Sequence, residues 1–145
     1  MVTVRRSVVS TAIAQLVPHI VGGVQSDFLA KREVTQRQFL LLLALHARPR
    51  CTVGGLAQRM QVSMPTVTGL IDRLAATGYV RRSSEPEDRR HVIIMLTAKG
   101  QDFIRRFQEA VQRRWDDVLR PLAAKELEAL HQVVTALSDA LQTHG

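Results

Sequence analysis

The sequence offers little material for disulfide, metal or membrane chemistry. It contains one cysteine, Cys51, which cannot form an internal disulfide. A secreted disulfide scaffold is therefore excluded, and we expect a reducing compartment, the cytoplasm. The five histidines show no His-x-x-x-His spacing, so we expect no metal site. The longest strongly apolar run, residues 39–45, is far shorter than the roughly 20 residues that a membrane helix requires, and no membrane span is expected.

Signals of catalysis are also missing. The sequence has no glycine-rich phosphate loop, no pair of acidic residues in matched environments, and no nucleophile with a base nearby. We therefore predict that the protein is not an enzyme and uses no cofactor.

Positive charge is abundant and unevenly placed. The 145 residues, about one domain's worth, carry a formal net charge of +7. Arginine supplies 17 of the 20 basic residues, and its planar guanidinium suits phosphates and guanine edges. The excess lies in residues 1–90, whereas residues 91–145 are neutral overall. This distribution favours a localised basic surface.

Apolar periodicity predicts helices at both ends of the chain. Apolar residues recur every three to four positions over residues 8–28, which predicts one long amphipathic helix with Pro18 inside it. Near the C-terminus, a helix over about residues 98–115 follows Thr97, a good N-cap, and a heptad seam on the last helix consists of Leu127, Leu130, Val134, Leu137 and Leu141.

Cap residues divide the middle of the chain into short helices. Thr35, Thr52 and Ser63 are good N-caps, each followed by an apolar pattern of helical period, and Gly78 closes the last of these helices. The helices that follow Thr52 and Ser63 are separated by a three-residue turn. Residues 79–96 then change to an extended pattern with a charged tip, which predicts a two-stranded hairpin.

This order of elements predicts a mainly α fold with a small β-hairpin (α+β), namely a winged helix-turn-helix. We predict a single domain over residues 1–145. Within it, residues 34–97 form a DNA-binding lobe, and residues 1–33 and 98–145 form a helical dimerisation region.

The helix after Ser63 has an outer face suited to the major groove. Its core face is Val67, Leu70, Ile71 and Leu74, and subtracting that face leaves small or polar residues and one arginine. The predicted DNA-binding residues of this helix are Ser63, Met64, Pro65, Thr66, Thr68, Gly69 and Arg73. The alternative is an ordinary solvated helix face. However, threonine and glycine are poor helix formers, so helix propensity does not explain their presence on an exposed face, and this favours contact with a ligand.

The charged tip of the hairpin is the second candidate site. Asp88 lies two residues before Arg90 and can hold its guanidinium in a fixed direction. An arginine held in this way can enter the minor groove, while Arg81, Arg82 and Arg89 meet phosphates. The alternative is a solvated charged turn with weak ion pairs.

Taken together, these segments resemble the MarR (multiple antibiotic resistance regulator) family of winged-helix regulators. The family's second helix is similar to residues 34–45, its third helix to 56–60, its recognition helix to 62–74, and its wing entry to 78–82. The most specific signature is Asp88-x-Arg90 followed by Leu96-Thr97 and Gly100. Many members carry arginine where this chain has Gly69, which shifts the expected base reading towards Thr66, Thr68 and Arg73.

The resemblance implies a homodimer joined through its first and last helices, with two winged helices on a pseudo-palindromic operator in double-stranded DNA. It also implies a function, that of a repressor released by a small aromatic or phenolic effector, for which the sequence identifies no ligand-binding residues. Some relatives sense peroxides through a cysteine in the first helix, where this chain has none, so we interpret Cys51 as incidental. The competing hypothesis is a winged-helix module that binds protein and not DNA.

Overall fold

Six helices and three short strands make up the part of the chain that the computed structural model describes, residues 4–84 and 91–143. The elements, in order, are α1 (Arg6–Ala30), α2 (Gln36–Ala47), β1 (Cys51–Thr52), α3 (Val53–Met60), α4 (Met64–Ala76), β2 (Val80–Ser84), β3 (Val92–Leu96), α5 (Ala98–Leu119) and α6 (Ala124–Thr143). The predicted fold class is confirmed. The chain divides into two compact units, residues 1–111 and 112–145, and the predicted division into functional regions stays a prediction.

The helices around the turn begin where the capping residues predict. Thr35 forms a capping box: its hydroxyl accepts from the backbone N–H of Gln38 at 3.2 Å, and its own N–H donates to the Gln38 side chain at 2.9 Å. The hydroxyls of Thr52 and Ser63 cap α3 and α4 by accepting from the backbone N–H groups of Gly55 and Thr66, at 3.0 and 3.3 Å. Gln61 ends α3 in the left-handed region, at φ 54°. The helix-turn-helix is therefore specified locally.

The sheet has three strands, one more than predicted. Its order is β1-β3-β2, and all pairs are antiparallel. Cys51 pairs with Ile94 and Thr52 with Ile93, so Cys51 lies in a strand. The prediction missed β1 because two residues show no periodicity. The strand ties the start of α3 to the hairpin.

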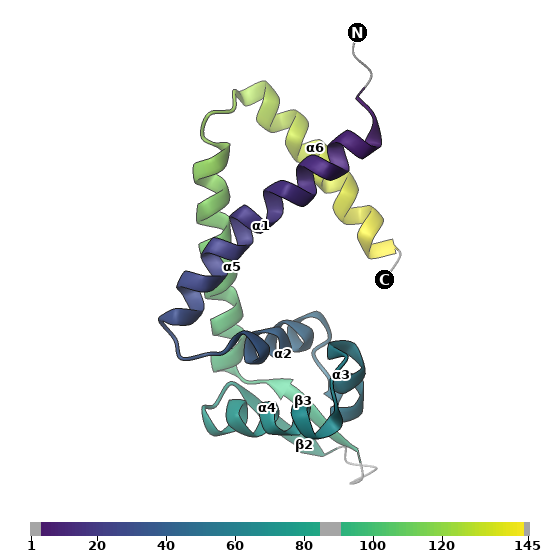
Figure 1. Ribbon diagram of the computed structural model, residues 1–145, viewed down its shortest axis with the longest axis vertical. Helices are drawn as coiled ribbons and strands as arrows, with labels where there is room; N and C mark the ends of the chain where they lie inside the picture. Colours follow the sequence, from purple (N-terminus) through teal and green to yellow (C-terminus); the bar gives the residue numbers. More distant parts are fainter. Residues whose placement is uncertain (1–3, 85–90, 144–145) are drawn as a thin grey trace. The chain divides into compact units, whose positions relative to one another are not determined.

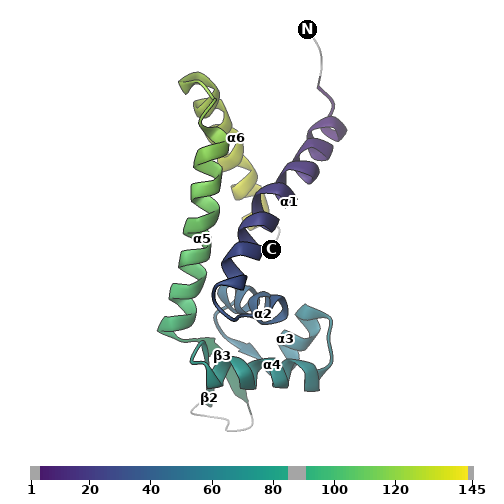
Figure 2. The same cartoon turned by 60° about the vertical axis from the view of Figure 1, so that its left-hand side comes forward.

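The core of the first unit lies between α2, α4 and the sheet. Figures 1 and 2 show α2, α3 and α4 gathered around β2 and β3. The largest fully buried side chains are Phe39, Leu41, Leu42, Leu45, Leu56, Val67, Ile71, Leu74, Ile94 and Ile104. The end of α1 joins this core through Phe28, whose ring meets those of Phe103 and Phe107 edge-on, with centroids 5.1 and 5.5 Å apart.

Two glycines set the connection from α4 through β2 to α5. Gly78 has φ +81°, a conformation that favours glycine, and it closes α4 as predicted. Gly100 lies so close to the strand entry that a Cβ there would be 2.2 Å from the carbonyl oxygen of Tyr79. Thr97 caps α5, since its hydroxyl accepts from the backbone N–H of Gly100 at 3.1 Å. The hairpin and α5 are thereby held in close backbone contact.

Helix α1 and helix α6 each expose a row of apolar side chains. On α1 these are Val8, Val9, Ile13, Leu16 and Val17, and on α6 they are Leu127, Val133, Val134, Leu137 and Leu141. By length and composition α1 is also apolar enough to cross a membrane, with a mean hydropathy of 1.4. The expectation that no segment spans a membrane rests on unbroken apolar runs alone, and that criterion does not register an apolar helix interrupted by polar residues, such as α1. Core helices of soluble proteins pass the same test, so the observation is weak evidence for a membrane.

Candidate nucleic-acid interface

Helix α4 divides into the two faces that the sequence predicts. Val67, Leu70, Ile71 and Leu74 are buried, and they fix which side of the helix turns outward. Of the predicted contact residues, Ser63, Met64, Pro65, Thr68 and Arg73 are exposed, whereas Thr66 and Gly69 are half-buried. The outer face therefore consists mostly of short side chains. A helix with such a face can approach the floor of a major groove closely.

Gly69 lies on this outer face without a structural need for glycine. A Cβ built at this position meets nothing within 4 Å, and the backbone does not adopt a positive φ. Glycine inside a helix costs up to about 1 kcal/mol relative to alanine. The packing of the chain therefore gives no reason for glycine here, but close approach of another molecule does.

Thr66 and Gly69 are half-buried because they line a groove between α4 and the start of α2. The groove, which we call the α2–α4 groove, has a volume of about 570 Å³ and is lined by Thr35, Gln36, Arg37, Pro65, Thr66, Gly69, Leu70 and Arg73. Sequence reasoning assigned no role to Arg37. The available signal was its position, two residues after the N-cap Thr35, on the first turn of α2.

An ion pair connects α4 to the hairpin on the other flank of the helix. The Arg82 guanidinium on β2 donates to the carboxylate of Asp72. Sequence reasoning assigned Arg82 to phosphate contacts and did not include Asp72. Both side chains stay partly exposed, at 39% and 61%. Asp72 therefore takes up part of the charge of Arg82 and links the strand to the recognition helix.

The remaining wing residues divide between the described and undescribed parts of the chain. Arg81 is exposed on β2, beside Met95 of β3. Asp88, Arg89 and Arg90 lie outside the described residues, so their predicted roles stay predictions.

The positive charge of the lobe lies mostly in residues 34–84, because its other acidic residues, Glu85, Glu87 and Asp88, belong to the part of the chain outside the described residues. Residues 34–84 contain seven arginines and a single acidic residue, Asp72, which is paired. On α5, acidic residues neutralise the arginines beside them. Arg105, and then Arg106, donate hydrogen bonds to the carboxylate of Asp102, and these bonds hold its pKa below the ordinary value. The positive potential is thus concentrated around α2, α3, α4 and β2. Such a surface attracts a polyanion.

Cys51 and the histidines supply no alternative site in the described part of the chain. No cluster of three or more histidine, cysteine or acidic side chains that could hold a metal occurs in residues 4–84 and 91–143. Cys51 is buried, and its thiol donates to the carbonyl oxygen of Arg48 at 3.3 Å.

Comparisons with known proteins identify relatives of this lobe and of the whole fold. Residues 34–92 match the model of the MarR family. The HTH-type transcriptional regulator YfiV of Bacillus subtilis is 31% identical over 112 residues, which cover 77% of this chain and 70% of that protein. The transcriptional regulator Tm0710 of Thermotoga maritima has a similar structure, with a TM-score of 0.85 at 22% identity over 96% of this chain and 97% of that chain. A mutant of MepR from Staphylococcus aureus, solved bound to an oligodeoxyribonucleotide, has a TM-score of 0.69 at 21% identity, covering 91% of this chain and 97% of its own.

Proposed function

Because this chain belongs to the MarR family of winged-helix transcriptional regulators, we propose that it is a dimeric, sequence-specific DNA-binding regulator of the cytoplasm. It acts as a repressor that leaves a pseudo-palindromic operator when a small aromatic or phenolic effector binds. The observation that carries this proposal is the outer face of α4, which is short, polar and flanked by arginines while its apolar face is buried.

In this proposal, α4 and the wing contact different parts of the DNA. Thr66 and Thr68 of α4 read base edges in the major groove, with Gly69 permitting close approach, and Arg73 contacts the DNA from the second half of the same helix. Ser63, Met64 and Pro65 contact the groove at the start of the helix. Arg81 and Arg89 bind phosphates, Arg82 does so while paired with Asp72, and Asp88 orients Arg90 into the minor groove. The structure of the MepR mutant with DNA supports the choice of ligand.

The exposed apolar rows on α1 and α6 support a homodimer. Side chains such as Ile13 on α1 and Leu137 on α6 are 45% and 52% exposed in the single chain. Apolar rows of this extent mark association surfaces in soluble proteins. Burial of α1 against a second copy of this chain would account for its apolar character, so no membrane is needed to explain it.

A small dimer that occupies an operator represses by excluding other proteins from the same DNA. Release by an effector then requires only that the ligand prefer the form of the protein that does not bind DNA. An aromatic acid is a suitable effector because its negative carboxylate complements the positive charge of the lobe.

Salt dependence of DNA binding tests the proposal. The purified protein is titrated into a fluorescein-labelled duplex selected by the protein itself from genomic fragments, at several salt concentrations between 50 and 200 mM. The logarithm of the affinity is expected to fall linearly with the logarithm of the salt concentration, by about 0.9 for each phosphate neutralised. A protein that binds no duplex even at the lowest salt, or binds with no salt dependence, contradicts the proposal and supports a protein-binding winged helix instead.

A further inference from the structure

The α2–α4 groove contains two arginines whose charge is not needed to hold the fold together. Arg37 comes from the first turn of α2 and Arg73 from the second half of α4, and the two residues line the same groove of about 570 Å³. None of the eight lining residues is acidic. Within residues 4–84 and 91–143, neither guanidinium has an ion-pair or hydrogen-bond partner. Two unpaired positive groups therefore share one concave surface.

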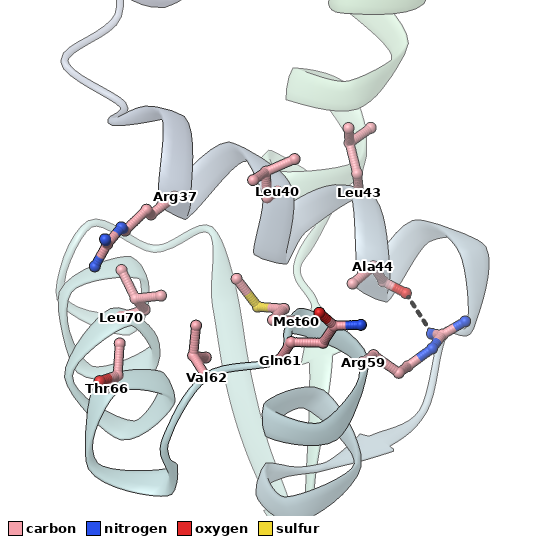
Figure 3. A pocket seen from close by; sticks show the side chains of 10 residues that line it. All are labelled: Arg37, Leu40, Leu43, Ala44, Arg59, Met60, Gln61, Val62, Thr66 and Leu70. Atoms are coloured by element: carbon pink, nitrogen blue, oxygen red, sulfur yellow. Dashed lines mark hydrogen bonds between the residues drawn. The ribbon is translucent and has the colours of Figure 1, made fainter.

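Arg59, the arginine of α3, has a hydrogen-bond partner within the protein. Arg59 of α3 donates to the carbonyl oxygen of Ala44 at 3.1 Å, which anchors α3 to α2. Figure 3 shows Arg59 at Ala44, whereas Arg37 extends from α2 towards the side of α4 that carries Thr66 and Leu70. These side chains line a neighbouring cleft of about 690 Å³, which shares Arg37, Thr66 and Leu70 with the α2–α4 groove. Arg37 is therefore free to bind a ligand, while Arg59 has a structural role.

The polar groups of the groove match the requirements of a phosphate diester. Arg37 and Arg73 supply charge and N–H donors. Thr66 also lines the groove, and its hydroxyl shares a hydrogen bond with that of Ser63 at 2.8 Å. Arginine is suited to bidentate contact with phosphate oxygens. Glu33 lines an adjacent groove with Arg73 but does not line this one.

The position of the groove relative to α4 indicates which phosphate it can take. The groove flanks α4 on the side of Thr66 and Gly69, whereas the ion pair with Arg82 places the hairpin at Asp72. A helix in the major groove has a sugar-phosphate backbone on each side. The wing serves one side, and α2 is available for the other.

From these observations we infer that the α2–α4 groove binds one backbone phosphate of the DNA in each protomer, held between Arg37 and Arg73. This inference rests on the proposed function and adds α2 to the DNA interface. Arg37 acts as a positioning residue: it fixes the register of α4 in the major groove and reads no base.

The test compares Arg37→Ala and Arg37→Lys with the parent protein on the labelled duplex selected by the parent. If each groove of a dimer holds one phosphate, Arg37→Ala lowers the salt slope by about 1.8. Between 50 and 200 mM salt the parent's affinity then falls about 12-fold more than the variant's, as follows from that slope. Arg37→Lys keeps a positive charge and retains most of the slope. The loss is the same on operator and on unrelated duplexes, since no base is read.

Arg113→Ala is the charge-matched control. Arg113 is exposed on α5 in the second unit, outside the lobe, and its loss removes the same charge without touching the groove. We expect its salt slope to equal that of the parent. Thermal unfolding followed by circular dichroism checks that each variant keeps its fold. This is expected because Arg37 is exposed and its side chain makes no hydrogen bond or ion pair among the described residues.

Replacing single phosphates of the duplex with uncharged methylphosphonates locates the contact. In the parent, methylphosphonates at one symmetry-related pair of positions flanking the major groove weaken binding, and in Arg37→Ala the same replacements have a clearly smaller effect, because only Arg73 is left to contact those phosphates. If the parent binds DNA but Arg37→Ala has the parent's slope and the same methylphosphonate profile, the inference about the groove is wrong and the proposed function stands. If the parent binds no DNA, the proposed function itself fails.

Discussion

The carboxylate of Asp72 on α4 accepts a hydrogen bond from the guanidinium of Arg82 on β2, ten residues later in the chain. The pair spans the junction between the recognition helix and the wing. Asp72 is the only acidic residue in residues 34–84, so its placement beside an arginine limits the repulsion that it would impose on DNA. The pair also gives β2 a side-chain link to α4 that is independent of the core.

Replacing Asp72 separates these two effects. In Asp72→Asn, removal of a negative charge strengthens binding to unrelated duplexes, while loss of the link weakens the fit to the operator. We therefore expect the ratio of operator to non-operator affinity to fall severalfold, with a change in unfolding free energy of no more than about 1 kcal/mol because the pair is exposed. Fluorescence anisotropy on the two duplexes measures the ratio.

The control for this variant is Asp102→Asn. Asp102 is a half-buried, ion-paired acid on α5 that accepts hydrogen bonds from Arg105 and Arg106. Asp102→Asn removes the same charge but leaves the pair of Asp72 and Arg82 in place. An unchanged affinity ratio in Asp72→Asn, or an equal fall in Asp102→Asn, contradicts the role of the pair.

Gly69 provides a test in which stability and binding move in opposite directions. Since a Cβ at this position meets nothing, Gly69→Ala is expected to stabilise the fold by roughly 0.5–1 kcal/mol. A larger side chain, as in Gly69→Leu, is tolerated by the fold but holds α4 away from the DNA and weakens operator binding. Urea unfolding and anisotropy give the two quantities.

Gly100→Ala is the contrasting control for the stability measurement. Its Cβ would clash with the carbonyl oxygen of Tyr79, so we expect a loss of about 1–3 kcal/mol in the free energy of unfolding. If Gly69→Leu binds the operator as tightly as the parent, close approach at this position is not needed and the role assigned to Gly69 is incorrect.

The wing carries the prediction with the largest expected effect on binding. Arg90→Ala removes the arginine that we place in the minor groove, and specific binding is expected to weaken by about 1–3 kcal/mol without unfolding. Asp88→Ala weakens it less, because the guanidinium remains but loses its orientation. Operator affinity measured at one fixed salt concentration tests both. Parent-like affinity of Arg90→Ala would show that the wing does not contribute as proposed.

The sequence predicted most of the lobe because the relevant forces act over a few residues. N-caps such as Thr35 and Ser63 satisfy backbone N–H groups within the next turn, and the spacing of Val67 and Leu74 defines the buried face of α4 without reference to the rest of the chain. These features specify the helix-turn-helix locally, and the structure confirms each of them.

The features that the sequence did not reveal depend on contacts between distant segments. Strand β1 exists because Cys51 and Thr52 meet β3 more than 40 residues later, and two residues carry no period of their own. The groove around Arg37 requires α2 and α4 to be placed side by side, and the partnership of Asp72 with Arg82 requires the turn of the strand. Charge alone indicated a basic lobe but could not assign each arginine to a partner.

The exposed row on α6 gives a test of the dimer that leaves the DNA-binding lobe unchanged. Leu137 is 52% exposed and Leu141 77% exposed, and α6 has no buried residue in the described chain, so substitutions there create no cavity in the single protomer. Leu137→Glu places a charge in the apolar row, where burial against a second copy would remove its hydration at a cost of several kcal/mol. We expect this variant to sediment as a monomer at concentrations where the parent is a dimer.

Gln132→Glu is the matched control, because it adds the same charge on α6 outside the apolar row and should leave the dimer intact. Loss of the dimer removes the second winged helix from the operator, so Leu137→Glu should also lose most operator affinity while keeping helical circular dichroism. Sedimentation velocity and anisotropy on the same samples decide the matter. If Leu137→Glu remains dimeric, the row on α6 does not form the interface, and if it becomes monomeric yet binds the operator like the parent, the two recognition helices do not act as a pair.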